Sequence, residues 1–154
     1  MEVPTGGTAG VDGDLAQDVV LAVESHLPED AVLTNGAGNF ASWVHRFYRH
    51  PGLARGHKVQ LAPTAGSMGY GVPAGVAANL LTGRTAFTIA GDGDFLMTGQ
   101  ELATAVQHGG KSIIVLLNNG MYGTIRMHQE REYPTHVSGS GLTNPDFAAL
   151  AKAY

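Results

Sequence analysis

Oxygen-bearing side chains follow two apolar runs that are predicted to be strands. Asp92 comes directly after the β-prone run 85–90, and Asn119 follows the apolar run 112–117. A predicted helix and its turns fill the interval, so the two runs form a right-handed strand–helix–strand unit with parallel, closely spaced strands. Ligands bind beyond the carboxyl ends of such strands. Residues 91–94 and 118–120 are predicted to form loops there, in which we expect the Asp92 carboxylate and the Asn119 amide oxygen to converge.

Both of these groups are hard oxygen ligands, which suit Mg²⁺ or Ca²⁺. Because Mg²⁺ takes six oxygens, two protein side chains leave positions for water and for the phosphate oxygens of a ligand. Asp92 and Asn119 therefore predict a phosphorylated cofactor. The alternative is that Asp92 and residues 118–119 only form turns after their strands, as Asp and Asn often do.

Two glycine-rich loops are further candidates for ligand binding. GAGNFA (36–41) fits the loose dinucleotide pattern G-x-G-x-x-G/A, but no Asp or Glu lies between Asp30 and Asp92 to bind a ribose. An NAD-type oxidoreductase is therefore disfavoured and stays open as an alternative. GSMG (66–69) allows close backbone approach to a flat ligand. Met68 would contact that ligand or, alternatively, pack in the core.

Other residue types add little to this list. The seven histidines show no metal-binding spacing, and only His128 is predicted to lie near the ligand edge. Ser67 has no recognisable His and Asp partners, so a serine hydrolase is not indicated. The chain contains no cysteine, which excludes disulfides and thiolate chemistry.

The elements that position these residues alternate between helix and apolar strand. That order predicts an α/β fold, a three-layer parallel sheet with helices on both faces. The pattern Thr98–Glu101 is a capping box that starts a helix, and Gly109–Gly110 ends it. The last helix is predicted to begin at Asn144 as N-cap, with Pro145 at its first position. Further helices are expected over 14–27, from Phe40 onward, and in the alanine-rich segment that ends at about Leu81. A short strand is expected over 31–34.

Length and composition predict one domain, with residues 1–13 as a linker or leader and 14–154 as the folded unit. The chain has 154 residues, 44% of them hydrophobic and 14% charged, which argues against disorder. Its net charge of −4 argues against nucleic-acid binding. No apolar run is long enough for a membrane span and no signal peptide is recognisable, so we expect a cytoplasmic protein.

The segment GDGDFLMTGQELATAVQHGGKSIIVLLNNGMYG resembles the cofactor motif of thiamine-diphosphate enzymes, in which GDG is followed by NN after a spacer of this length. TAGSMGYGVPAGVAANL resembles the segment that precedes this motif in the same family. The resemblance covers about residues 30–154 and is strongest to the acetolactate-synthase-like branch. It implies the diphosphate-binding domain of that family, incomplete at its C-terminus.

This resemblance implies roles for individual residues. Asp92 and Asn119 would hold Mg²⁺ through their side chains and Met121 through its main-chain carbonyl, and the metal would bind the diphosphate. Met68 would be the wedge against which the cofactor bends. The other implied cofactor contacts are Asn39, Gly66, Ser67, Gly91, Gly93 and Tyr122.

The same resemblance implies decarboxylation of a 2-oxo acid, with thiamine diphosphate as the electron sink. The substrate pocket would include Ile125 and His128. Pyruvate-type decarboxylases usually have a glutamate at the position of Ile125, so we expect ligation to a second carbonyl compound. A simple 2-oxo-acid decarboxylase and a non-catalytic cofactor-binding or subunit-pairing module remain alternatives, and FAD dependence stays open.

Three residues depart from the family pattern. Asp94 replaces a small residue, Phe40 replaces a histidine beside the diphosphate, and His128 replaces a tryptophan. The family's activating glutamate lies on a separate pyrimidine-binding domain, usually across a dimer interface. The resemblance therefore implies a homo-oligomer, dimer or tetramer, and no turnover by this chain alone.

Overall fold

The computed structural model describes residues 13–50 and 60–154. Residues 1–12 of the predicted linker lie outside these ranges, whereas Gly13, its last residue, begins the first helix. The described residues form the following elements in chain order: α1 (Gly13–His26), β1 (Val32–Asn35), α2 (Phe40–Phe47), β2 (Gln60–Leu61), α3 (Gly71–Thr82), β3 (Ala86–Gly91), α4 (Asp92–Thr98), a 3₁₀ turn (Gly99–Glu101), α5 (Leu102–His108), β4 (Ser112–Leu117), α6 (Gly123–Glu132) and α7 (Phe147–Ala153).

The four strands form one parallel sheet in the order β2-β1-β3-β4. The predicted α/β fold is thus confirmed, and β3 and β4 are direct neighbours. Gly91 lies opposite Leu117 in the register, so the two strands end at the same edge of the sheet. Every residue of β3 is buried, as expected for a central strand covered on both faces.

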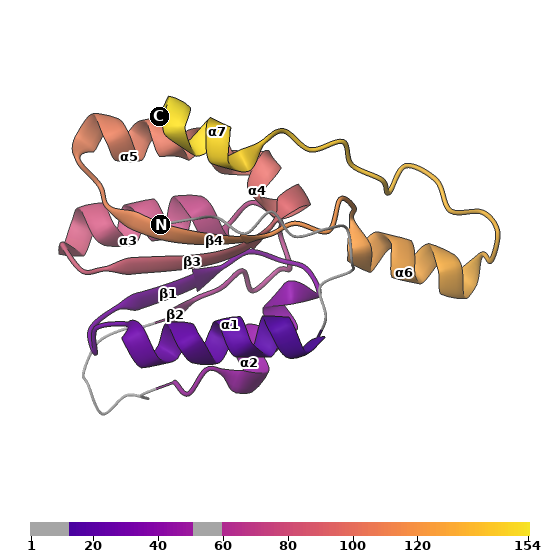
Figure 1. Cartoon of the computed structure of the whole chain (residues 1–154), viewed down its shortest axis with the longest axis horizontal. Helices are drawn as coiled ribbons and strands as arrows, with labels where there is room; N and C mark the ends of the chain where they lie inside the picture. Colours follow the sequence, from indigo (N-terminus) through magenta and orange to yellow (C-terminus); the bar gives the residue numbers. More distant parts are fainter. Residues whose placement is uncertain (1–12, 51–59) are drawn as a thin grey trace.

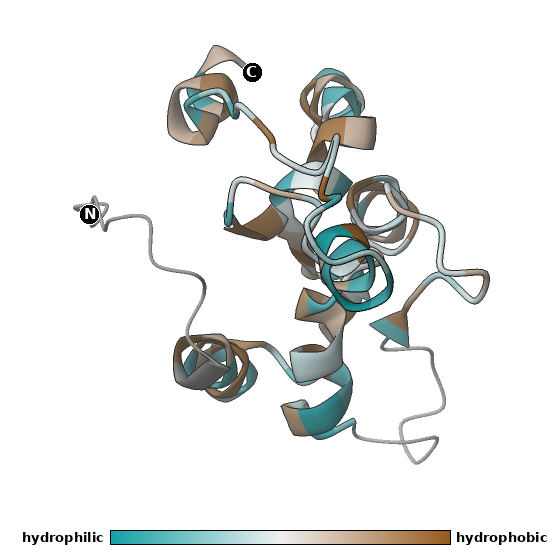
Figure 2. Cartoon of the chain, turned by 90° about the vertical axis from the view of Figure 1, so that its right-hand side faces the viewer, coloured by the Kyte–Doolittle hydropathy of each residue, from teal (hydrophilic) through white to brown (hydrophobic). Residues whose placement is uncertain are grey.

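Helices cover both faces of the sheet (Figure 1). Because side chains alternate along a strand, Phe87 and Ile89 pack with α1 and α2, whereas Ala90 packs on the opposite face with Val72 of α3 and Phe95 of α4. Figure 2, turned by 90°, shows the same separation of α1 and α2 from α3, α5 and α7. These two apolar clusters hold the carboxyl edge of the sheet in place.

Helix α3 lies especially close to the sheet. A Cβ at Gly75 would overlap Oγ1 of Thr88, and Gly71 accepts a hydrogen bond from Oγ1 of Thr34 through its carbonyl oxygen (2.9 Å). The hydroxyls of Thr34 and Thr88 are 2.7 Å apart and share a hydrogen bond. The two buried threonine hydroxyls are thus paired at the helix–sheet contact.

Three local predictions are wrong. Residues 91–94 are not a loop, because Gly91 ends β3 and α4 begins at Asp92. The capping box at Thr98 is not formed, since its hydroxyl donates instead to the carbonyl of Gly69 (2.7 Å) and the segment starts with a 3₁₀ turn. The N-cap of the last helix is Asp146, whose carboxylate accepts from the N–H groups of Ala148 and Ala149 (both 2.9 Å).

Helix α6 follows β4 and was not predicted, since its sequence has no apolar stripe at helical spacing. It projects from the sheet and none of its residues is buried (Figure 1). The chain then returns, and Tyr122 donates its N–H to Ser140 while Leu142 donates to Gly120 (both 2.8 Å). Within the described ranges, no helix is long and apolar enough to cross a membrane.

Candidate cofactor site

A pocket of about 450 Å³ lies beyond the carboxyl ends of β1, β3 and β4. It brings together residues from four separate parts of the chain. All of the predicted site residues except Ser67 and His128 line it: Asn39, Gly66, Met68, Gly91, Asp92, Gly93, Asn119, Met121, Tyr122 and Ile125. The position agrees with the general location of ligand sites in parallel sheets.

Asp92 is the first residue of α4 and is only 2% exposed. Its Oδ2 accepts hydrogen bonds from the N–H of Gly120 (2.9 Å) and from Nδ2 of Asn144 (2.7 Å). The same Asn144 amide nitrogen also donates to Oδ1 of Asn118 (2.7 Å). The amide group therefore bridges the side-chain oxygens of Asp92 and Asn118. Sequence reasoning assigned Asn144 to a helix cap and missed its place here.

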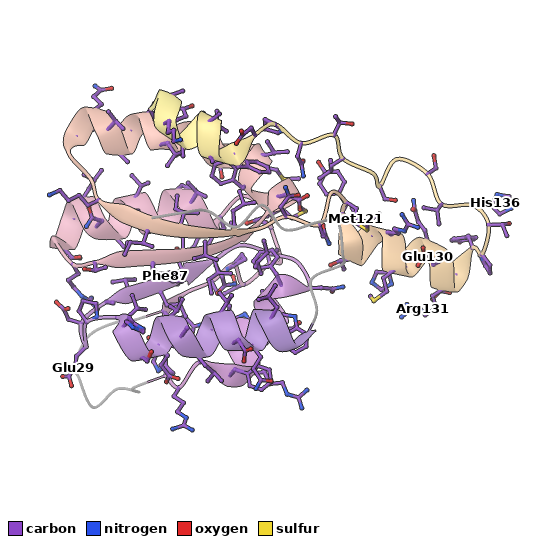
Figure 3. The ribbon with its side chains drawn as sticks, viewed as in Figure 1. Glu29, Phe87, Met121, Glu130, Arg131 and His136 are labelled. Carbon is purple, nitrogen blue, oxygen red and sulfur yellow. The ribbon has the colours of Figure 1, made fainter. Side chains whose placement is uncertain are left out.

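The loop after β4 is held by a local hydrogen bond and by a contact with the returning chain. Oδ1 of Asn119 accepts from the N–H of Met121 (3.2 Å), and the antiparallel contact between Met121 and Gly141 fixes the loop against the returning chain. Figure 3 places Met121 where β4 gives way to α6, at the base of the projecting part. Asn119 and Met121 are therefore next to Gly120, which binds Asp92 directly.

The glycines at the end of β3 are required by packing. A Cβ on Gly91 would lie 2.9 Å from the ring of Phe40, and one on Gly93 would lie 2.5 Å from the ring of Tyr122. Both rings also line the pocket. Side chains at these two positions would displace the rings and fill the space where a ligand would approach the backbone.

Asp94 joins two loops at the back of the pocket. It is 2% exposed, and its Oδ1 accepts from the N–H groups of Gly69 (2.8 Å) and Ala37 (3.1 Å). Its Oδ2 is buried without a hydrogen-bond partner. Burial raises the pKa of this carboxyl above its ordinary value, and the two backbone donors oppose that shift. The carboxylate thus binds backbone N–H groups of two loops that border the pocket.

The two predicted residues outside the pocket lie on exposed surface. Ser67 is exposed in the loop before α3. His128 is exposed on α6, with Nδ1 2.9 Å from a guanidinium nitrogen of Arg131. The lining also contains Trp43 and Thr124, which sequence reasoning did not single out. Thr124 accepts the N–H of Asn39 at 3.1 Å and so links α6 to the first loop.

The donor set fits a hard cation that is shared with a phosphorylated ligand. The described residues contain no group of three or more His, Cys, Asp or Glu side chains able to hold a metal by themselves. One carboxylate with neighbouring amide and main-chain oxygens instead suits Mg²⁺, which keeps waters and phosphate oxygens in its coordination shell. The glycine-lined wall leaves room for such a ligand.

Comparison with known proteins agrees with this geometry. The family model "Thiamine pyrophosphate enzyme, C-terminal TPP binding domain" matches residues 36–154. The chain is 34% identical over 142 residues to the acetolactate synthase large subunit of Parasynechococcus marenigrum, which covers 90% of this chain and 22% of that protein. It is 35% identical over 129 residues to the large subunit of acetolactate synthase isozyme 2 of Escherichia coli, which covers 82% of this chain and 23% of that protein.

A third relative, the acetolactate synthase of Mycobacterium bovis, is 33% identical over 149 residues, which cover 92% of this chain. The chain spans about a quarter of the length of these relatives. Every residue that lines the pocket lies within the matched family region. The chain therefore belongs to the thiamine pyrophosphate enzyme family, in which it corresponds to the C-terminal TPP binding domain.

Proposed function

We propose that this chain binds thiamine diphosphate together with Mg²⁺ as part of a 2-oxo-acid carboligase similar to acetolactate synthase. The observation that carries the proposal is the single pocket that contains both Asp92 and Asn119, at the shared edge of β3 and β4. The named relatives are acetolactate synthases, and the resemblance to them extends through all the pocket-lining segments.

The diphosphate end of the pocket would be formed by the loops after β3 and β4. Asp92 and Asn119 would ligate Mg²⁺ through side-chain oxygens, and Met121 through its main-chain carbonyl. Oδ2 of Asp92 accepts a hydrogen bond from the Asn144 amide, which would help to orient the carboxylate toward the cation. Asn39, Gly91, Gly93 and Tyr122 would border the phosphates, and Ser67 would approach from the exposed loop.

The opposite end would receive the aminopyrimidine. Gly66 would offer its carbonyl, and Met68 would support the bent form of the cofactor. When bound, thiamine diphosphate supplies the electron sink for loss of CO₂ from a 2-oxo acid. Ile125 presents an apolar side chain to the pocket and no proton donor, which favours ligation to a second carbonyl compound over protonation. His128 would contribute to the substrate side if α6 packs against a further domain.

Calorimetric titration of the chain tests the proposal. Thiamine diphosphate should bind in the presence of Mg²⁺ and bind at least about 10-fold more weakly with EDTA, because the metal neutralises the charge between Asp92 and the phosphates. Asp92→Asn should weaken Mg²⁺-dependent binding to a similar extent. Asp18→Asn, a change on the exposed side of α1, serves as the matched control. Equal binding with and without the metal would contradict the proposal.

The activity of the whole protein is part of this proposal. We infer no turnover by the 154-residue chain alone, because a complementary pyrimidine-binding domain would supply the activating glutamate. Mixing the chain with such a domain and measuring carboligation and aldehyde products distinguishes three outcomes: a carboligase, a simple decarboxylase or a non-catalytic module. We further propose that the protein is cytoplasmic and that it forms a homo-oligomer. Sedimentation of the reconstituted protein would test the oligomeric state.

A further inference from the structure

The loop that carries Met68 has few contacts of its own. Gly66 and Gly69 both adopt positive φ angles (67° and 84°), so the loop bends sharply before and after Met68. Residues 64–67 are exposed. The position of Met68 in the pocket must therefore be set by whatever holds the ends of this short loop.

Side chains of helix α4 bind both the N–H and the carbonyl oxygen of Gly69. Oδ1 of Asp94 accepts the Gly69 N–H (2.8 Å), and the hydroxyl of Thr98 donates to the Gly69 carbonyl (2.7 Å). The contact is also tight, since a Cβ on Gly69 would lie 3.0 Å from Cγ2 of Thr98 and 3.1 Å from Cβ of Met97. Two hydrogen bonds and direct packing thus fix one residue of the loop to one helix.

The same helix begins at Asp92, which lines the pocket and which the proposed function assigns to the diphosphate end. A helix of seven residues is a short rigid rod of about 10 Å, given 1.5 Å per residue. Asp94 also accepts the N–H of Ala37, so it ties the first loop to the same rod. Thr98 does not line the pocket, so its hydroxyl acts from behind the loop.

We propose that α4 sets the spacing between the two ends of the pocket, with Asp94 and Thr98 as positioning residues for Met68. This inference rests on the proposed function, because it assigns Met68 to the aminopyrimidine end and Asp92 to the diphosphate end. Removing the Thr98 hydroxyl should loosen only the Met68 end. A ligand that spans both ends should lose affinity, whereas a ligand confined to the Asp92 end should not.

Two probes separate these ends. Thiamine diphosphate with Mg²⁺ occupies both, and inorganic pyrophosphate with Mg²⁺ occupies only the diphosphate end. Thr98→Val should weaken thiamine diphosphate about 2- to 10-fold, the range expected for one hydrogen bond, and change pyrophosphate affinity less than 2-fold. Thr98→Ser keeps the hydroxyl and should restore affinity. Thr104→Val is the matched control, because it removes a hydroxyl that Thr104 of α5 donates to the carboxylate of Glu101.

A spin label reports the mobility of the loop that carries Met68 in the absence of any ligand. The chain has no cysteine, so Ala65→Cys, at an exposed position near Met68, gives a unique attachment site. Thr98→Val and Asp94→Ala should each increase the mobility of this label, and Thr98→Ser and Thr104→Val should leave it unchanged. If Thr98→Val does not fold, Thr98→Ala removes the same hydroxyl with less added apolar volume.

The outcomes are distinct. Wild-type chain that binds neither probe would contradict the proposed function, and the label would still decide whether α4 holds the loop. Unchanged label mobility and unchanged thiamine diphosphate affinity in Thr98→Val would overturn the positioning role. Equal weakening of thiamine diphosphate and pyrophosphate would also overturn it, since that result indicates a general loosening of the domain.

Discussion

Asp94 combines burial, charge and an unpaired oxygen in one side chain. Its Oδ1 is bonded to two backbone donors, whereas Oδ2 is buried without a partner. An ionised carboxylate pays a desolvation cost in such a place, and this cost is the larger cause of its raised pKa. Asp94 stands where the family pattern has a small residue, and a carboxylate close to a diphosphate would repel it unless its side chain turned away. The structure directs Oδ1 toward the loop backbone of Gly69 and Ala37 instead.

The raised pKa predicts how stability changes with pH. The folded state holds the Asp94 proton to a higher pH than the unfolded state, so its contribution is fully present below the ordinary aspartate pKa of 3.8. That contribution is lost as pH rises through the raised, folded-state pKa. We therefore expect wild type to lose stability relative to Asp94→Asn as the pH rises through this window. Urea unfolding of both proteins in metal-free buffer, from pH 3 upward, measures this difference. A difference that moves toward wild type would mean that the two N–H donors outweigh burial.

At the scale of elements, α3 packs closely against the sheet and against the first loop of the pocket. Helix α3 approaches the sheet closely because Gly75 has no side chain to separate it from Thr88. A Cβ on Gly71 would lie 2.7 Å from the N of Gly36, so the same helix also packs against the first loop. The close approach of α3 to the sheet and to the first loop therefore depends on these two glycines.

Gly75→Ala tests this close packing. Alanine favours helix over glycine by about 1 kcal/mol, but the added methyl overlaps Oγ1 of Thr88 and overpacking costs about 1–3 kcal/mol. We expect a net loss of about 1 kcal/mol or more in the free energy of unfolding, measured by urea denaturation. Ala77→Gly, at an exposed position of α3, calibrates the helix term alone. A Gly75→Ala variant more stable than wild type would show that the contact is loose.

At the scale of the whole molecule, the parallel sheet makes the site. All four strands point the same way, so loops from distant parts of the chain meet at one edge. The pocket joins loops and helices that belong to both faces of the sheet. A ligand there would contact segments from several parts of the chain, and should stabilise the fold by mass action.

This coupling predicts a thermal shift. With Mg²⁺ and thiamine diphosphate at about 100 times the dissociation constant, the stabilisation is about 2.7 kcal/mol, which raises Tm by about 5–10 °C in a chain of this size. EDTA should remove most of the shift, because the diphosphate then meets Asp92 without a cation. Differential scanning calorimetry measures both. A shift of equal size in EDTA would argue for binding that does not involve the metal.

Sequence alone determined the order and type of most elements. Apolar runs at 85–90 and 112–117 formed strands with nearly the predicted bounds. The central strand β3 is buried throughout, as a continuous apolar run predicts, whereas the edge strand β4 is only partly buried. Glycines ended α5 as expected, with Gly109 at φ 71°. The convergence of Asp92 and Asn119 in one pocket also followed from the order of strands, since parallel neighbours end at the same edge.

Tertiary structure decided which partner each polar side chain takes. Thr98 fits a capping box locally, yet its hydroxyl bonds Gly69, which only the folded chain brings near. Asn144 fits an N-cap, yet its amide binds Asp92 and Asn118 across the site. Local sequence fixes which backbone shapes are favourable, but a polar group takes whichever donor or acceptor burial leaves beside it, and that depends on segments far apart in the chain.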